Sequence, residues 1–291
     1  MNIINLTMQD SLIVHALHFP CDNPKAVVQI IHGLKEHKQR YVYFSKFLQN
    51  NGYAVIVSDN RGHALSVNEN FPLGHMETIE LMVSDQYEIT SYAKKLYPNT
   101  PVYMLGHSFG SMIARNYIQS YDDELSKLVL SGTVGYDPLV FIPIFLGNII
   151  IKFQGRHGKS KLLKMLLGVE NGDTSWVCGN KEVMEEYKKD PFCSGYTYTN
   201  QAMHTIFNAL KRLHNFQAYK CKNPDMPILS IVGELDPVTK GKKGIKDSEN
   251  TLKKAGYKNV TTIVYKDMKH EVLNEIGKEL VYQDVLSFLD R

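Results

Sequence analysis

A serine between two glycines directly follows a short apolar run, and this pattern restricts the local fold more than any other in the chain. The apolar run is Val102–Leu105, and the pentapeptide is Gly106-His107-Ser108-Phe109-Gly110. It is typical of a strand that turns very tightly into a helix, with glycines where side chains would collide with neighbouring backbone. The serine is then strained, and the first amides of the helix point toward any negative charge beside it.

The pentapeptide alone is weak evidence, because it arises by chance in roughly one chain of this length in ten at average compositions. Elsewhere in the 291 residues, however, short β-branched runs alternate with helical patterns, which predicts an α/β fold with a mainly parallel sheet between helices. The predicted strands are Ser11–His18, Ala26–Ile31, Ala54–Ser58, Val102–Leu105, Lys127–Ser131, Ile228–Val232 and Thr261–Tyr265. The predicted helices are Tyr41–Asn51, Ile79–Leu96, Ser111–Tyr121, Glu249–Ala255 and Lys278–Leu289.

The alternation stops between about Val134 and Lys222, where helical runs occur without a clear strand. These runs are Lys159–Leu167, Lys181–Lys189 and Asn200–Leu213. An insertion between two strands lies over the carboxyl ends of the strands, where open α/β sheets bind ligands. We therefore predict a core formed by residues 1–133 and 223–291, and a helical cap formed by residues 134–222.

Composition excludes several classes of partner. A net charge of +3 is too small to indicate nucleic acid, and the run Lys240–Lys243 is interpreted as a solvated loop. The four cysteines have no Cys-x-x-Cys spacing, so we expect reduced thiols in a cytoplasmic protein. No metal-ligand motif occurs, and we expect neither a metal nor a cofactor.

The apolar stretch Leu139–Ile151 raises the question of a membrane. It is shorter than the roughly 20 residues of a transmembrane helix and contains Pro143 and Gly147. We predict an apolar cap element over a lipid-binding pocket, with possible transient contact to a membrane surface.

A serine nucleophile needs a base, and the base needs an orienting acid. After a turn of this kind, the acid and then the histidine follow the serine in the chain. Asp236 follows the predicted strand Ile228–Val232, and His270 follows Thr261–Tyr265. We predict Ser108 as nucleophile, His270 as base and Asp236 as acid. The competing acids are Glu234, Asp267 and Asp225, and the other histidines considered are His157, His204 and His214.

An oxyanion formed at Ser108 needs two backbone donors. One is expected from Phe109, the residue after the serine. The other is expected from Leu34, in the turn His32-Gly33-Leu34 after the strand Ala26–Ile31. The alternative is that this turn merely ends the strand.

Five segments together resemble the monoacylglycerol lipase and lysophospholipase branch of the α/β-hydrolase superfamily. They are His32–Tyr41, Asp59–Ser66, Gly106–Gly110, Gly233–Val238 and His270–Glu275. The resemblance covers nearly the whole core in order and spacing, and it is weakest in the cap. It implies an α/β-hydrolase fold with an eight-stranded sheet and a helical cap, and hydrolysis of acyl esters by Ser108, Asp236 and His270.

Three residues stand where that branch usually has glycine, namely Lys35, Ala64 and Ser111. Lys35 places a long cation beside the predicted oxyanion turn. It is either a solvated loop residue or a group that favours substrates with a negative charge, such as a phosphate. The matching loop that carries Asp59, Arg61 and His63 is interpreted as structural support of the site.

The expected function is that of a serine carboxylester hydrolase that cleaves single-chain acyl esters, of the monoacylglycerol or lysophospholipid type, through an acyl-enzyme intermediate. One alternative is an aminopeptidase-like amidase with the same triad, which would need acidic residues in the cap. Another is an inactive protein of the same fold that binds a small molecule. The acids considered are Glu182, Glu185 and Glu186, and the acyl pocket is expected from Leu139–Ile151, Phe153 and Leu162–Leu163.

Overall fold

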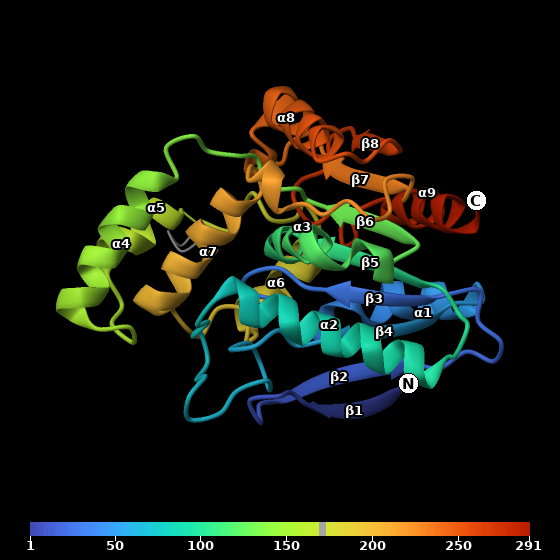
Figure 1. Ribbon diagram of the computed structural model, residues 1–291, viewed down its shortest axis with the longest axis horizontal. Helices are drawn as coiled ribbons and strands as arrows, with labels where there is room; N and C mark the ends of the chain where they lie inside the picture. Colours follow the sequence, from blue (N-terminus) through green and yellow to red (C-terminus); the bar gives the residue numbers. More distant parts are fainter. Residues whose placement is uncertain (169–172) are drawn as a thin grey trace.

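A sheet of eight strands, in the order β1-β2-β4-β3-β5-β6-β7-β8, runs through the centre of the molecule (Figure 1). The computed structural model describes residues 1–168 and 173–291, so residues 169–172 of the predicted cap lie outside the described residues. The strands are β1 (Asn2–Thr7), β2 (Ile13–Phe19), β3 (Val27–Ile31), β4 (Ala54–Ser58), β5 (Val102–His107), β6 (Lys127–Ser131), β7 (Ile228–Gly233) and β8 (Val260–Tyr265). β1 and β2 pair antiparallel, and every pairing among β3 to β8 is parallel. The predicted sheet is confirmed.

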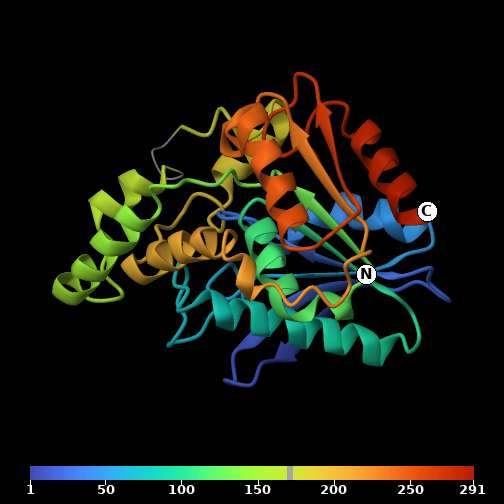
Figure 2. The same ribbon diagram turned by 45° about the horizontal axis from the view of Figure 1, so that its top comes forward.

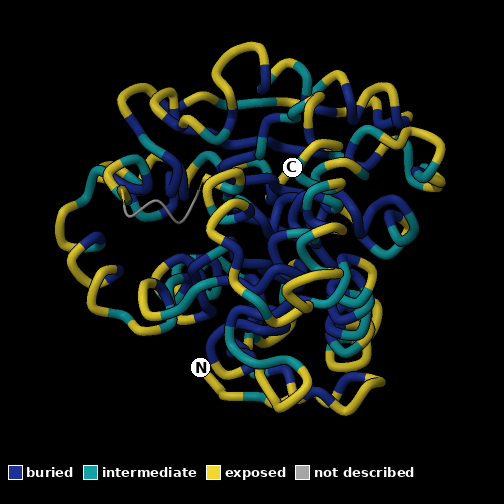
Figure 3. The backbone as a smooth tube through the Cα atoms, turned by 90° about the vertical axis from the view of Figure 1, so that its left-hand side faces the viewer, coloured by how far each residue is buried: buried dark blue, intermediate teal, exposed yellow. Residues whose placement is uncertain are grey.

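Helices cover both faces of this sheet, with α1 and α9 on one face and α2, α3 and α8 on the other (Figure 2). The helices are α1 (Val42–Asn50), α2 (Ile79–Leu96), α3 (Phe109–Tyr121), α4 (Phe141–Gln154), α5 (Lys161–Leu167), α6 (Lys181–Lys189), α7 (Asn200–Arg212), α8 (Gly241–Lys254) and α9 (Lys278–Asp290). Every residue of β3, β4, β5 and β7 is buried. The apolar runs of these strands follow from burial on both faces, and Figure 3 shows exposed stretches around a buried interior.

Two elements differ from the sequence-based predictions. β1 was not predicted, because most of its residues are exposed and it pairs with β2 alone at the edge of the sheet. The run Lys240–Lys243 is not a loop, since α8 begins at Gly241. The buried residues of α8 are Gly244, Ser248, Thr251 and Leu252. Their spacing is helical, but most of them are small or polar, so the apolar pattern is faint.

Residues 134–222, which we call the cap segment, contain α4 to α7 and no strand within their described part. In Figure 1, α4, α5 and α7 extend beyond the carboxyl ends of the strands. α7 contacts both α4 and α5 on one side and α3 on the other, so it connects the outer helices with the sheet. In the described part of the chain, no helix has both the length and the apolar character needed to cross a membrane.

Candidate active site

Ser108 alone forms the turn between β5 and α3. Its backbone has φ 52° and ψ −118°, a conformation that costs a residue with a side chain roughly 1–3 kcal/mol. The surrounding structure holds it in place, since the Ser108 amide donates to Ser131 O at 2.8 Å and Ser111 Oγ donates to Ser108 O at 2.6 Å. The serine identified from the pentapeptide is therefore a strained residue at a strand end.

Close backbone contacts explain the glycines around this turn. A Cβ on Gly106 would lie 2.4 Å from Gly110 O, and a Cβ on Gly110 would lie 2.1 Å from Ile31 O. No side chain fits at either position. A Cβ on Gly33 would lie 2.9 Å from Ser108 Cβ, so the turn after β3 packs directly against the serine.

His270 and Asp236 meet in the loops that follow β8 and β7. His270 Nδ1 donates to Asp236 Oδ2 at 2.8 Å, and the two side chains are 4% and 0% exposed. Asp236 Oδ1 accepts a second bond from the Val238 amide at 2.8 Å. Because the Nδ1 proton faces the carboxylate, Nε2 is the ring nitrogen that can accept a proton. Gly132 makes room for the ring, since a Cβ there would lie 2.8 Å from His270 Cε1.

The competing acids lie on the surface. Glu234, Asp267 and Asp225 are all exposed. Glu234 accepts a bond from the Asp267 amide at 3.4 Å, and Asp225 pairs with Lys258 at 3.1 Å. Of these four carboxylates, all within the described chain, Asp236 is the one hydrogen-bonded to His270.

The expected oxyanion donors lie at the same cavity as the serine and the histidine. Leu34 and Phe109 line this cavity together with Ser108 and His270. Phe109 is the first residue of α3, so its amide belongs to the unpaired amides of a helix start. The structure thus brings all five predicted site residues together, with Asp236 behind His270.

His32 supports the turn that carries Leu34. Its Nε2 accepts the Asn60 amide at 2.8 Å, so Nδ1 carries the proton and donates to Gly33 O at 2.8 Å. Burial lowers the pKa of His32 to about 4, which keeps the ring neutral and this pair of bonds intact at neutral pH.

Lys35, the next residue in the turn, is buried, so its interpretation as a solvated loop residue is wrong. The residue is 8% exposed. Its Nζ donates to Tyr196 O and lies 3.9 Å and 5.1 Å from the ring centres of Tyr196 and Tyr198. Its φ is 58°, and that of Ala64 is 44°. Both residues therefore occupy the left-handed region, which explains why glycine suits these two positions.

The hydroxyl of Tyr198, a cap-segment residue, is the centre of a buried network. It accepts the Lys35 amide at 2.9 Å and lies 2.9 Å from His63 Nε2 and 3.2 Å from the Tyr196 hydroxyl. His63 Nδ1 lies 3.1 Å from Arg61 O and must donate to that carbonyl. Nε2 is then the acceptor for Tyr198, and the Tyr196 hydroxyl donates to Tyr198. Burial lowers the pKa of His63 to about 3, consistent with a neutral ring.

A buried contact between a histidine and a carboxylate lies behind the catalytic candidates. His107 Nε2 is 3.2 Å from Glu36 Oε1, the Tyr41 hydroxyl donates to Glu36 Oε2 at 2.8 Å, and His107 Nδ1 is 3.1 Å from Ser131 Oγ. Burial opposes both charges, but their mutual attraction lowers the pKa of Glu36 and raises that of His107. The His107 ring lies 4.7 Å from the His270 ring.

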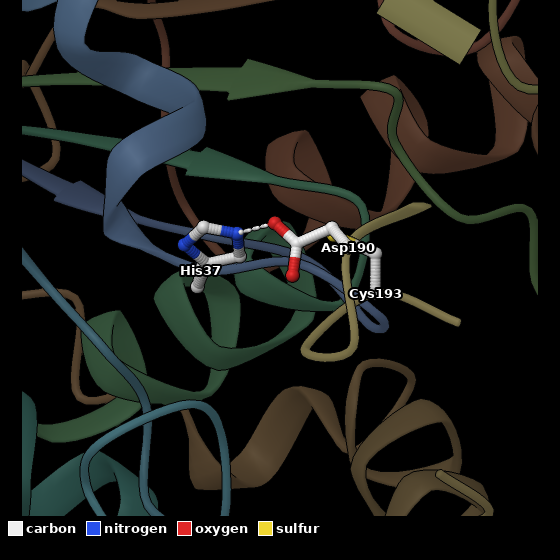
Figure 4. A group of neighbouring side chains, drawn as sticks. All are labelled: His37, Asp190 and Cys193. Carbon is white, nitrogen blue, oxygen red and sulfur yellow. Dashed lines mark hydrogen bonds and ion pairs between the residues drawn. The ribbon is translucent and has the colours of Figure 1, made fainter. Parts of the chain in front are cut away.

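Two side-chain groups within the described ranges each place three potential metal-ligand atoms within 4.8 Å of one another. In the first, shown in Figure 4, His37 Nε2 bonds to Asp190 Oδ2 at 2.7 Å beside Cys193. The second consists of Glu36, His107 and Glu271. Each group already contains a direct imidazole–carboxylate contact, which accounts for its histidine and one of its carboxylates without an ion.

The cavity above Ser108 has a volume of about 470 Å³. Its lining is mostly apolar, and most of this apolar lining comes from the cap segment. The apolar residues include Met112, Leu139, Val140, Ile142, Pro143, Leu166, Leu167, Ile206, Phe207 and Leu210. Part of the predicted acyl pocket is therefore present. Phe153 and Leu162–Leu163 do not line it, and Phe153 is 79% exposed.

The acids considered for an amide substrate do not reach this cavity. Glu182, Glu185 and Glu186 are exposed on α6 and do not line it. The residues that sequence reasoning missed are Tyr196, Tyr198 and Trp176, all in the cap segment. The Trp176 ring lies 5.2 Å from that of His270. No local pattern connects these aromatic residues with a site formed by distant loops.

Comparisons with known proteins agree with this geometry. The family model described as serine aminopeptidase, S33, matches residues 22–277. The chain is 28% identical over 277 residues to a monoacylglycerol lipase of Mycolicibacterium smegmatis, covering 95% of this chain and 92% of that protein. It is 26% identical over 265 residues to a probable lysophospholipase L2 of Haemophilus influenzae, covering 88% and 80%.

Among solved structures, a thermostable carboxyl esterase from Bacillus coagulans superposes with a TM-score of 0.88 at 24% identity. The alignment covers 99% of this chain and 97% of the esterase. At this level of identity the likeness establishes the fold, and it extends over the cap segment as well as the sheet.

Proposed function

Because this chain belongs to the S33 serine aminopeptidase family and has the α/β-hydrolase fold, we propose that it is a serine carboxylester hydrolase. Its substrates are single-chain acyl esters of the monoacylglycerol or lysophospholipid type. One observation carries the proposal: a strained serine lies in a largely apolar cavity that also contains a histidine bonded to a buried aspartate. The names of the relatives agree with this substrate class.

In this mechanism Ser108 Oγ attacks the ester carbonyl carbon and transfers its proton to His270 Nε2. Asp236 holds the ring in the required tautomer and stabilises the imidazolium. The amides of Leu34 and Phe109 donate to the oxyanion. His270 then protonates the departing alkoxide, which leaves an acyl-enzyme on Ser108. A water molecule then loses a proton to His270 and attacks the acyl carbon. When the bond between this carbon and Ser108 Oγ breaks, His270 returns the proton to Ser108 Oγ and the fatty acid departs.

The cap segment, in this proposal, selects the substrate. It is the inserted unit 134–222 between two core parts, 1–133 and 223–291, and it supplies most of the apolar lining. The cavity volume falls within the ~300–1,000 Å³ typical of small-molecule sites. A flexible acyl chain would lie among α4, α5 and α7, with its carbonyl carbon at Ser108.

The outer surface of the cap segment supports contact with a lipid surface. Large apolar side chains are exposed on α4 and α5, beside the exposed Lys152, Lys159 and Lys161. They are Phe141, Ile142, Phe145, Ile149, Phe153, Leu162, Met165 and Leu166. An apolar face edged by lysines suits the interface of an anionic bilayer. Ile142 and Leu166 also line the cavity, so a substrate could pass from a membrane to Ser108.

We place the protein in the cytoplasm, because its four cysteines have no spacing that indicates a disulfide framework.

The decisive test is Ser108→Ala assayed on acyl esters from acetyl to palmitoyl, with a monoacylglycerol, lysophosphatidylcholine and an aminoacyl amide in the same panel. Ester cleavage should fall to background while the melting temperature is retained. Ser91→Ala, an exposed serine on α2, is the matched control and should keep full activity. An unchanged rate in Ser108→Ala, or cleavage of the amide alone by the wild type, would refute the proposal.

A further inference from the structure

The turn that carries Leu34 contacts the cap segment on two sides, although the two regions are more than 100 residues apart in sequence. On one side, Lys35 contacts Tyr196 and Tyr198. On the other, His37 contacts Asp190 across a 2.7 Å bond (Figure 4). Lys35 and His37, two residues that follow the predicted oxyanion donor Leu34, are therefore attached to the cap segment.

The Lys35 attachment uses both the backbone and the side chain. The amide donates to the Tyr198 hydroxyl at 2.9 Å, while Nζ donates to Tyr196 O and faces both tyrosine rings. A buried ammonium needs such partners, because burial removes its hydration. Its ammonium faces the cap segment, and Lys35 also lines the cavity, so contact with a charged substrate is the competing role.

The core side of this contact is equally fixed. His63 accepts from the Tyr198 hydroxyl and is anchored to Arg61 O. Tyr198 thus connects two core loops: the turn after β3 and the loop after β4. A shift of the segment that carries Tyr198 would change the direction of the Lys35 amide, and with it the adjacent Leu34 amide.

We propose that Lys35 is a positioning residue that couples the place of the cap segment to the direction of the Leu34 amide. This inference rests on the proposed function for its catalytic consequence. The lysine adopts a left-handed backbone that glycine would occupy without strain. Its side-chain contacts with the cap segment offer a reason why a lysine is present at this strained position.

The test compares Lys35→Gly with the wild type. Glycine keeps the backbone amide and accepts φ 58° but removes the ammonium contacts. Loss of one oxyanion donor lowers kcat ~10²–10³-fold, so a misdirected donor should lower kcat by about tenfold, with KM little changed. Lys35→Arg, which keeps a cation over the rings, should recover most of kcat. Because His37 still bonds to Asp190, the fold should persist.

Ala64→Gly is the matched control, since it also relieves a left-handed residue in a neighbouring loop but removes no cap contact of Lys35. It should leave kcat unchanged. Hydrogen exchange supplies a readout that does not depend on catalysis. In Lys35→Gly, peptides covering residues 33–37 and 196–199 should exchange faster, and in Ala64→Gly they should not.

The possible outcomes separate the two proposals. If exchange and kcat in Lys35→Gly match those in Ala64→Gly, the coupling is refuted. If KM rises only for a phosphate-bearing ester, Lys35 contacts substrate and the positioning role is wrong. If the wild type cleaves no ester in the panel, the proposed function fails, and the exchange data alone then decide whether Lys35 couples the two regions.

Discussion

The core loops around Ser108 and the outer helices of the cap segment are built on opposite principles. Around the serine, buried polar groups such as His32, His63 and Asp236 have identified hydrogen-bond partners. On α4, only Gly147 is buried, and several large apolar side chains face outward. The core loops hold the reacting groups in fixed positions, whereas the outer helices of the cap segment expose an apolar surface. Chemistry and substrate choice can therefore be altered separately.

Among the changes considered in the core loops, Asp236→Asn should lower the catalytic rate most severely. The amide cannot hold His270 in the proton-accepting tautomer, so we expect kcat to fall by about 10⁴-fold with the fold intact. Steady-state ester kinetics provide the measurement. Asp225→Asn, which changes an exposed carboxylate, is the control. A loss below tenfold in Asp236→Asn would mean that another group orients the histidine.

Gly132→Ala tests the placement of the imidazole without removing a functional group. The new Cβ would lie 2.8 Å from His270 Cε1 and 3.1 Å from His107 Cε1. Displacement of the ring should lower kcat by about 10²-fold. Gly155→Ala is the matched control, because Gly155 also has positive φ (77°) but has nothing within 4 Å of the added Cβ. Equal losses in the two variants would show that backbone strain, and not the ring contact, causes the effect.

Phe145→Ser with Phe153→Ser tests the outer helices of the cap segment. Both side chains are exposed, at 64% and 79%, and neither lines the cavity. Binding to vesicles of phosphatidylglycerol and phosphatidylcholine should weaken by at least about tenfold, since inserting a phenylalanine contributes roughly 1.5–3 kcal/mol. Cleavage of a water-soluble short-chain ester should not change. Retained binding in a sedimentation assay would contradict the proposed membrane contact.

The smallest expected effect is a dependence of the folding stability on pH, caused by two buried histidines of the core. Burial holds the pKa of His32 at about 4 and that of His63 at about 3, below the ~6.5 of an unfolded chain. As the pH falls below about 6.5, the unfolded chain takes up protons that the folded protein excludes, so stability decreases. Between pH 7 and 5.5 we expect a loss of about 1 kcal/mol per histidine in urea unfolding. If NMR shows either ring titrating near pH 6.5 in the folded protein, the expectation is wrong.

Sequence reasoning placed the elements of the fold correctly where the local pattern is strong. The buried strands β3 to β7 have largely apolar runs, and Ser108, Asp236 and His270 follow strand ends in a recognisable order. It failed where a position depends on distant partners. β1 has a weak pattern because it is an exposed edge, and α8 buries mainly small and polar side chains.

Lys35 illustrates the same limit at the site. Nothing near it in sequence indicates that two tyrosines about 160 residues later surround its ammonium. The family resemblance seen in the sequence is weakest in the cap segment, so the aromatic residues of this segment could not be assigned in advance. The one available signal in the sequence was that Lys35 stands where the family usually has glycine. This signal identified the correct turn but not the tyrosines that contact the lysine.

The cap segment is also bonded to the loop that carries His270, where the Glu271 amide donates to Val177 O at 2.9 Å and the Gly179 amide to Glu275 Oε1 at 2.7 Å. Together with the contacts of Tyr196 and Tyr198, these bonds define an inner part of the insertion that is attached directly to the core. α4 and α5 lie outside this inner part, and the segment between them is bonded to α7, where the Gln201 amide donates to Arg156 O at 3.0 Å. Chimeras with relatives should therefore join at residues 141 and 167, because a graft that replaced the whole insertion would also replace the supports of the reacting groups.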